Sequence, residues 1–332
     1  MNQNQLSKEQ VQDFHRDGYV IVPNFCSLEE TDRLYQVALK DDAMGKNALD
    51  LNDQSGKKTR LSLWFTPGKD VFGYLSRSEK TVSAVGQLLD SDSPVCHFHS
   101  KLMQKEPKVG GAWEWHQDYG YWYKNQFMFP DQLMSVMIAL TSANKANGCL
   151  QVIKGSHKLG RVNHGFAGEQ VGADMVMVDN ALKTMELVYC EMAPGDALFF
   201  HSNVLHRSEA NLSDHARWSI ISCYSSQSNL AYNETSTAWK SPVNVVPDEA
   251  ILRWEADSLS KADFLAALDG ILASNVFEVE GLPLVTAAAG KYLSGRAGFA
   301  DYLIGEAAAA AGCNETVTFD KKLKGSAGYR VL

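Results

Sequence analysis

A histidine and an aspartate lie two residues apart in the most aromatic stretch of the chain. His116 and Asp118 stand in the sequence WEWHQDYGYWYKNQF, which occupies residues 113–127. If this segment begins as a β-strand, side chains two residues apart point to the same face, so an imidazole and a carboxylate would lie together. Both groups can bind a metal ion, and a third ligand would have to come from another part of the chain.

Several histidines downstream are candidates for that third ligand: His157, His164, His201, His206 and His215. His97 and His99, which alternate with Phe98 upstream, are interpreted as structural histidines. We favour His206, because it follows a predicted strand and tight turn that can return the chain to the same end of a β-structure. Arg217 opens an apolar strand shortly afterwards, where a permanently charged guanidinium needs an anionic partner. Two histidines, a carboxylate and open coordination positions are typical of non-haem Fe(II) oxygenases, and a nearby arginine suits a carboxylate cosubstrate.

The surrounding sequence predicts a β-rich domain that can position these groups. Short apolar segments between residues 95 and 226 are predicted strands, separated by turn residues at close spacing. Many short strands with no intervening helices favour a sandwich or barrel over a parallel α/β sheet. Near the N-terminus, Ser7 and Ser27 are predicted to cap two flanking helices with a strand between them.

The chain also resembles the phytanoyl-CoA dioxygenase family of Fe(II)/2-oxoglutarate oxygenases over residues 6 to about 256. The matching segments are FHRDGYVIVPNF, WHQD, NGCLQVIKGSH, PGDALFFHSNVLH and the run HRSEANLSDHAR that ends at Arg217. The resemblance implies a mainly β fold with flanking helices around a double-stranded β-helix, or jelly-roll, core. It also implies Fe(II) as the metal, 2-oxoglutarate and O2 as cosubstrates, and His116, Asp118 and His206 as the iron ligands.

The same resemblance implies how the cosubstrate is held. Arg217 would bind the distal carboxylate of 2-oxoglutarate, helped by Ser219. Lys101 is either a surface lysine or a contact to cosubstrate or substrate. Related halogenases have a small apolar residue at the position of Asp118, so the carboxylate here favours hydroxylation of a small molecule with release of succinate and CO2.

Aromatic residues that follow Asp118 are candidates for the walls of a substrate pocket: Tyr119, Tyr121, Trp122 and Tyr123. Such walls would exclude water from a reactive centre. The alternative interpretation is that the same residues simply pack in the core. Neither interpretation identifies the substrate, because one fold hosts many substrates.

The composition changes near residue 258, which divides the chain into a predicted oxygenase domain, 1–258, and a segment, 259–332. The second part is small and rich in alanine, and the spacing of its apolar residues predicts mostly helix. It resembles the C-terminal half of a PIN-domain ribonuclease. Asp301 and Asp320 match two Mg²⁺-binding residues of that family, but the aspartate of its first strand and the glutamate of its early helix are missing upstream. We therefore expect a non-catalytic segment. The alternatives are Mg²⁺-dependent ribonuclease activity in this segment and a jelly roll that binds metal or ligand without catalysis.

The overall charge and hydropathy narrow the possible partners. The 332 residues include 31 basic and 39 acidic side chains, for a net charge of −8, which argues against a nucleic-acid partner. No apolar run approaches the length of a membrane span, and the N-terminus is polar where a signal peptide would be apolar. We expect a cytoplasmic protein with a small-molecule substrate and no membrane partner, and the sequence leaves its oligomeric state open.

Overall fold

The computed structural model describes residues 5–40, 48–53, 55–123, 129–167, 169–229, 241–254, 261–272 and 281–332. The chain divides into two compact units, Met1–Trp254 and Glu255–Leu332, which are treated separately below. The boundary predicted at residues 258–259 lies outside the described residues. Within the described ranges, no helix combines the length and the apolar character needed to cross a membrane.

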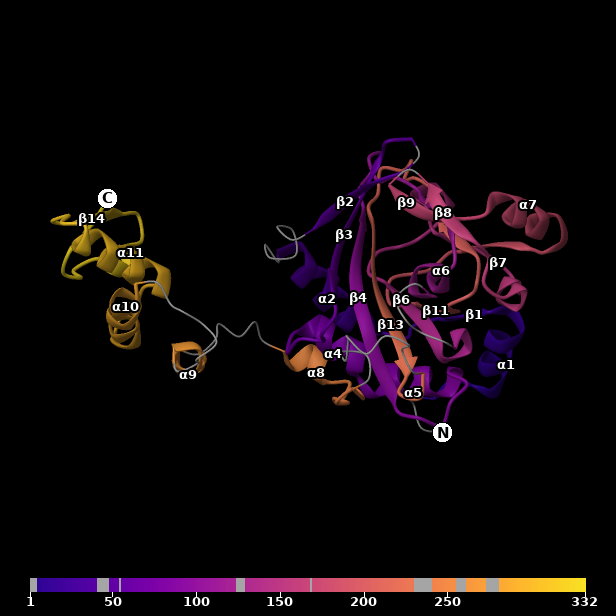
Figure 1. The fold of residues 1–332 in the computed structure, drawn as a ribbon, viewed down its shortest axis with the longest axis horizontal. Helices are drawn as coiled ribbons and strands as arrows, with labels where there is room; N and C mark the ends of the chain where they lie inside the picture. The colour runs from indigo at the N-terminus through magenta and orange to yellow at the C-terminus, as the bar shows by residue number, and fades with distance from the viewer. Residues whose placement is uncertain are drawn as a thin grey trace. The chain divides into compact units, whose positions relative to one another are not determined.

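Two antiparallel sheets form the centre of the first unit (Figure 1). The larger sheet has the spatial order β1 (Tyr19–Val22), β11 (Ala197–His201), β6 (Leu133–Ala139), β13 (Arg217–Ser226), β4 (Val95–Lys105), β3 (Lys58–Trp64) and β2 (Leu49–Asn52). The smaller sheet has the order β10 (Leu187–Cys190), β7 (Leu150–Ile153), β12 (His206–Ser208) and β5 (Trp113–His116). Neighbours in each sheet come from distant parts of the chain. The predicted mainly β fold with a jelly-roll core is confirmed.

The alternation of side chains along the strands separates two apolar layers. On β6, Val136 and Ile138 pack with the helices that cover the larger sheet, whereas Met137 points into the layer shared with the smaller sheet. On β13, Ile220 and Ile221 divide in the same way. Because both faces are covered, β6 and β13 are buried along their whole length. The polar side chains among them are therefore held in a dry interior.

The helices α1 (Lys8–Asp17), α2 (Leu28–Lys40), α4 (Val71–Arg77) and α5 (Glu79–Leu88) pack against the larger sheet. The predicted capping box of α1 is present, since Ser7 and Gln10 exchange hydrogen bonds, and Gly18 ends the helix with φ of 83°. Lys80 of α5 forms a buried ion pair of 2.6 Å with Glu30 of α2. These helices brace the outer face of the sheet whose inner face carries the site.

The sequence did not predict every element between the strands. Helix α7 (Met175–Thr184) and the hairpin of β8 (His164–Ala167) and β9 (Gln170–Ala173) lie between β7 and β10 in the chain. Asp174 caps α7 by accepting a hydrogen bond from the backbone N–H of Val176. The expectation of no helix among the strands is therefore wrong at α7. Figure 1 shows α7 and this hairpin on the opposite side of the unit from α2 and α4.

The second unit contains three helices and a small sheet among its described residues. They are α9 (Lys261–Leu272), α10 (Leu282–Ser294), α11 (Phe299–Ala310) and the parallel pair β14 (Thr316–Thr318) and β15 (Tyr329–Val331). Its small core consists of Ala288, Ala297, Tyr302 and Leu323. The mostly helical character predicted for this segment agrees with these elements.

Candidate active site

Three side chains that could bind a metal ion meet where two strands of the smaller sheet pair. His116 ends β5 and His206 begins β12, and the two residues are direct neighbours across this pair. Gln117 is extended, with φ of −113° and ψ of 136°, and the short helix α6 (Asp118–Trp122) starts at the next residue. The extended residue keeps Asp118 on the same side as His116. The two side chains that the sequence placed on one strand thus come from a strand end and a helix start.

The three donor atoms are close enough to share one ion. One ligand atom from each of His116, Asp118 and His206 lies within 4.8 Å of the other two. The Nε2 atoms of the two histidines are 3.8 and 3.9 Å from Oδ1 of Asp118, and all three side chains are at most 5% exposed. Within the part of the chain that the structure describes, this is the only such group of three or more His, Cys, Asp or Glu residues. We refer to these three residues as the triad.

Backbone carbonyls fix the orientation of both imidazoles. Nδ1–H of His116 donates to the carbonyl oxygen of Glu114 at 2.7 Å, and Nδ1–H of His206 donates to that of Val204 at 2.9 Å. In each neutral ring the remaining nitrogen, Nε2, then carries a free lone pair that faces the carboxylate. This arrangement is the one seen in metal-binding histidines, whose second nitrogen is held by a carbonyl or carboxylate.

The electrostatics of the triad also suit a divalent metal. Burial lowers the pKa of His116 and of His206 below the ordinary value of 6.5, so both rings are neutral at pH 7. Burial alone would raise the pKa of Asp118. The charge of Lys101, the electrostatic interaction with the two imidazoles and a 2.6 Å hydrogen bond from Ser135 Oγ together outweigh burial and lower that pKa to about 2. Two neutral imidazoles and one ionised carboxylate are a donor set for first-row metals.

A buried arginine without a partner faces a cavity next to the triad. Arg217 is 3% exposed and lines a cavity of about 30 Å³ together with His206. Its Nε and Nη1 atoms have no hydrogen-bond partner among the described residues, and neither has the hydroxyl of buried Ser219. Burial lowers the pKa of Arg217 to about 10, so it remains charged at pH 7. Unpaired buried donors and charge cost free energy unless a ligand satisfies them, and a carboxylate would do so.

Lys101 connects this cavity to a larger one. Its side chain, on β4, is partly buried and lines both cavities. Within the described ranges it makes no hydrogen bond or ion pair. Its ammonium group is therefore available to an anionic ligand on either side.

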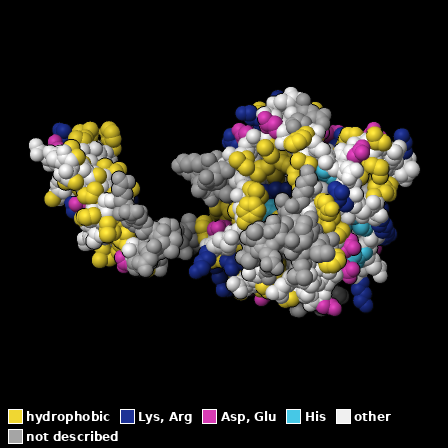
Figure 2. All heavy atoms as spheres, viewed as in Figure 1, with side chains coloured by type: hydrophobic (Ala, Val, Ile, Leu, Met, Phe, Trp, Pro, Cys, Tyr) yellow, Lys and Arg dark blue, Asp and Glu magenta, His cyan; other side chains and the backbone are white. Residues whose placement is uncertain are grey.

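The larger cavity has a volume of about 220 Å³ and reaches the triad from the other side. Its walls are Leu61, Leu63, Phe65, Phe98, His99, Lys101, Trp113, His116, Asp118, Tyr121 and Trp122. Figure 2 shows hydrophobic side chains around a hollow in the face of this unit, with basic and histidine atoms visible inside it. We call this space the apolar cavity.

The predicted wall residues fall into two groups. Tyr121 and Trp122 line the apolar cavity, as the pattern of aromatic residues suggested. Tyr119 is buried in the layer between the sheets, and Tyr123 is 43% exposed with the guanidinium carbon of Arg161 4.2 Å from its ring centroid. Neither Tyr119 nor Tyr123 is among the lining residues.

Sequence reasoning missed the part of the apolar cavity that β3 and β4 provide. Leu63 of β3 pairs with Lys101 of β4, and Leu61 lies on the same face two residues earlier. His99, two residues before Lys101, was interpreted as structural, yet it lines the cavity. The alternation of these residues was visible in the sequence, but the pairing of β3 with β4 was not.

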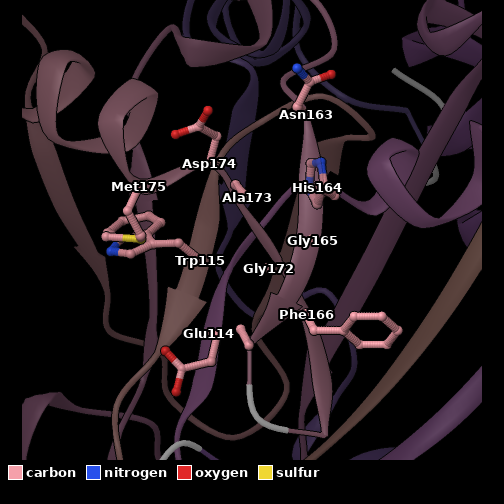
Figure 3. Close-up of a pocket in the computed structure, with 11 residues that line it drawn as sticks. Glu114, Trp115, Asn163, His164, Gly165, Phe166, Gly172, Ala173, Asp174 and Met175 are labelled. Atoms are coloured by element: carbon pink, nitrogen blue, oxygen red, sulfur yellow. The ribbon is translucent and has the colours of Figure 1, made fainter.

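A further hollow of about 440 Å³ lies against β5 and the β8–β9 hairpin (Figure 3). His164 of β8 accepts a hydrogen bond at Nε2 from the backbone N–H of Gln117, and its Nδ1–H donates to the carbonyl oxygen of Val162. A Cβ atom on Gly120 would lie 2.2 Å from this ring, so α6 and β8 approach closely there. His164, one of the histidines considered as a third ligand, thus supports the turn that joins two triad residues and does not belong to the triad.

The two acidic residues of the PIN-like segment have local structural contacts. Asp301 accepts a hydrogen bond from the N–H of Gly298 at the start of α11, and Asp320 accepts one from the N–H of Lys322. Neither carboxylate belongs to a described group of three ligands that could share an ion. The structure gives the ribonuclease alternative no support in the described residues.

Comparison with known proteins identifies the family. A family model described as phytanoyl-CoA dioxygenase (PhyH) matches residues 14–219. The chain belongs to this family. Among curated relatives of this phytanoyl-CoA dioxygenase family member, ectoine dioxygenase from Halomonas elongata is 26% identical over 269 residues, covering 76% of this chain and 79% of the relative. Phytanoyl-CoA dioxygenase domain-containing protein 1 from Bos taurus is 26% identical over 257 residues, covering 64% and 87%.

Solved structures share the fold of this family member. EctD from S. alaskensis with bound Fe matches with a TM-score of 0.60 at 20% identity, covering 74% of this chain and 90% of that one. The epimerase SnoN, in complex with Fe3+, alpha ketoglutarate and nogalamycin RO, matches with a TM-score of 0.57 at 18% identity, covering 73% and 91%. At these identities the likeness establishes the jelly-roll architecture.

Proposed function

We propose that this chain is a non-haem Fe(II)- and 2-oxoglutarate-dependent dioxygenase that hydroxylates a small molecule and releases succinate and CO2. One observation carries the proposal: the triad places its three donor atoms within 4.8 Å of one another, beside a buried arginine whose nitrogens lack partners. The names of the relatives support it, since one is an ectoine dioxygenase and another is named for its phytanoyl-CoA dioxygenase domain. The solved structures add that EctD from S. alaskensis binds Fe in one structure and 2-oxoglutarate with 5-hydroxyectoine in another.

In this proposal His116, Asp118 and His206 hold Fe(II). With 2-oxoglutarate and O2 as cosubstrates, the bound Fe(II) would couple oxidative decarboxylation of 2-oxoglutarate to hydroxylation of a C–H bond, with one oxygen atom of O2 entering succinate and the other entering the product. The chain orients the ligands through the two Nδ1–H contacts to backbone carbonyls and through Ser135, which donates to Oδ2 of the carboxylate. Three protein ligands leave coordination positions for the cosubstrate and O2.

Arg217 and Ser219 are assigned to the distal carboxylate of 2-oxoglutarate. The guanidinium can donate two parallel N–H bonds to one carboxylate through Nη1 and Nη2, of which Nη1 has no partner in the described residues. The unpaired hydroxyl of Ser219 lies two residues further along the same strand face. Lys101, which lines the cavities on both sides, is assigned to the same cosubstrate as a second positive charge.

The substrate is assigned to the apolar cavity, with Tyr121 and Trp122 among its walls. Tyr121 is held by hydrogen bonds between its hydroxyl and the backbone of Val171. Fixed aromatic walls exclude water from the reaction and so protect it from side reactions.

The test is anaerobic loading with Fe(II) and 2-oxoglutarate, followed by exposure to O2 and measurement of succinate. We expect a visible absorption band on formation of the iron–cosubstrate complex and iron-dependent succinate release. His116→Ala and Asp118→Ala should each reduce this release by more than about 100-fold. His215→Ala, which changes an exposed histidine outside the site, is the matched control and should not reduce it.

Succinate release at the wild-type rate in both triad variants would refute the proposal. Tight iron binding without succinate release in the presence of any candidate substrate would favour a non-catalytic metal-binding jelly roll.

A further inference from the structure

The apolar cavity is small, and part of its lining is both apolar and exposed to solvent. Its volume of about 220 Å³ is below the range of about 300–1,000 Å³ that is common for drug-sized ligands, so its occupant is compact. Leu63 and Phe65 at the lining are 42% and 52% exposed. Most of the other walls are aromatic or aliphatic, which favours an apolar ligand.

The charged groups that line this cavity do not suit a cation. Asp118 is the only carboxylate among the described lining residues. Its Oδ2 accepts the hydrogen bond from Ser135, and its Oδ1 faces the two imidazoles of the triad. The ammonium group of Lys101 lies in the same wall. A cationic ligand would therefore lose its hydration and meet a positive charge without gaining a carboxylate partner.

His99 is the one lining histidine outside the triad, and its hydrogen-bonding capacity is unused. The side chain is 7% exposed, and its Nδ1 is shielded with no partner. Nε2 also makes no hydrogen bond within the described residues. Burial lowers the pKa of His99 to about 3, so the ring is neutral at pH 7, with one N–H donor and one lone pair.

The orientation of His99 is fixed by aromatic neighbours. Its ring lies edge-on to Phe98, Trp122 and Phe65, with centroids 4.5, 5.7 and 6.1 Å away. Of the other charged or hydroxyl-bearing lining groups, the triad is assigned to iron, the hydroxyl of Tyr121 is hydrogen-bonded to the backbone of Val171, and Lys101 is assigned to the cosubstrate. Buried polar groups normally have a partner, so a ligand in this cavity is the partner that His99 lacks.

We propose that the substrate is a compact, uncharged, largely apolar molecule that presents one hydroxyl or carbonyl group to His99, which makes His99 a specificity-determining residue. This inference rests on the proposed dioxygenase function. The inference predicts a different substrate from that of the ectoine dioxygenases. Ectoine carries both a carboxylate and a cationic ring amidine, so it is expected to bind poorly here.

The first test compares probes of one shape and different charge. Cyclohexylmethanol, cyclohexylmethylamine and cyclohexanecarboxylate are titrated calorimetrically into the full chain loaded anaerobically with Fe(II) and 2-oxoglutarate, with ectoine as a fourth ligand. We expect the alcohol to bind at least about tenfold more tightly than the amine, the carboxylate or ectoine. Tighter binding of any charged probe, or no binding of the alcohol, would overturn the inference.

The second test asks whether His99 makes the polar contact. His99→Phe should weaken binding of the alcohol about tenfold, because the hydroxyl is left without a partner. His99→Gln, whose amide offers a donor and an acceptor, should restore most of the affinity. His97→Phe is the matched control: this buried histidine of β4 is hydrogen-bonded to Ser100, does not line the cavity and should leave the affinity unchanged. If the control does not fold, His215→Phe on the surface replaces it.

The absorption band of the iron–cosubstrate complex, recorded before each titration, separates the two proposals. If the band forms and a charged probe binds best, the substrate inference fails and the dioxygenase proposal stands. If no band forms with any preparation, the dioxygenase proposal fails. The substrate inference, which depends on it, then fails as well. An equal loss of alcohol affinity in the His97→Phe and His99→Phe variants would show a general structural effect and would overturn the role of His99.

Discussion

Replacing Arg217 with methionine should have two opposite effects. It should stabilise the protein without cosubstrate, and it should weaken the binding of 2-oxoglutarate. In the protein without 2-oxoglutarate, burial lowers the pKa of Arg217 from its ordinary value of 12.5 to about 10. At pH 7 the group is charged in both the folded and the unfolded chain, so the full cost of burying that charge, about 3 kcal/mol, weakens the folded state. Methionine has a similar length and no charge. Arg217→Met should therefore raise the free energy of unfolding of the ligand-free protein by up to about 3 kcal/mol.

The same substitution should abolish tight binding of 2-oxoglutarate. Nη1 has no partner in the described structure, and Nη1 and Nη2 together form the end of the guanidinium that can donate two bonds to one carboxylate. Each hydrogen bond between charged groups contributes about 1.5–3 kcal/mol, and the loss of two corresponds to roughly a 10²- to 10⁴-fold rise in Kd. Arg217→Lys keeps the charge but not the planar pair of donors, so its loss should be intermediate, about 10- to 100-fold.

The assays are chemical denaturation without cosubstrate and calorimetric titration of the anaerobic Fe(II) protein with 2-oxoglutarate. Arg207→Met is the matched control, because this arginine of β12 pairs with Gln151 and Glu209 and should not alter cosubstrate affinity. The reasoning is refuted if Arg217→Met lowers the stability of the ligand-free protein and leaves the Kd for 2-oxoglutarate within about threefold. That pair of results would mean that the guanidinium has a partner within the protein.

Two further predictions concern the metal ligands and the dependence of stability on pH. Ser135→Ala removes the hydroxyl that donates to Asp118 and should weaken iron binding about 10- to 100-fold in an anaerobic chelator competition, whereas Ser222→Ala, at a buried serine outside this contact, should not. Burial lowers the pKa of His97 to about 4 and of His99 to about 3, so the unfolded chain takes up protons first below pH 6.5. The contribution of these two neutral rings to the free energy of unfolding is present above pH 6.5 and should be lost as the pH falls from 6.5 to 4. A Tm that stays constant over this window would contradict the burial of both rings.

The architecture of the first unit was predictable because its signals are local. Closely spaced apolar segments and turn residues predicted strands between residues 95 and 226, where β4, β6, β11 and β13 of the larger sheet lie, but β2 and β3 were not predicted. The capping box at Ser7 and the helix end at Gly18 depend only on neighbouring residues and are present as predicted. Helix α7 was missed because its apolar residues Met175, Val176 and Met177 are exposed, so they do not form the buried stripe by which an amphipathic helix is predicted.

The candidate site was predictable only in part, for a physical reason. The spacing of His116 and Asp118 is a local property. His206 and Arg217 were favoured for their places after a predicted turn and at the start of an apolar strand, and the resemblance to a family then implied their roles. The walls of the apolar cavity depend instead on which strands pair. His99 was interpreted as structural because no local feature shows that β3 lies beside β4 and leaves its ring facing a cavity.

The sequence alone determined the chemistry available to this protein: two imidazoles, a carboxylate and an arginine in apolar segments, all of them side chains whose types fix their donor atoms and charge. The tertiary structure decided which of these groups meet. Pairing of β5 with β12 brings His206 opposite His116, and the covered inner face of β13 leaves Arg217 buried without a partner. Residues far apart in the chain become neighbours only when two sheets close over a common interior, and burial then sets their pKa values and their need for a ligand.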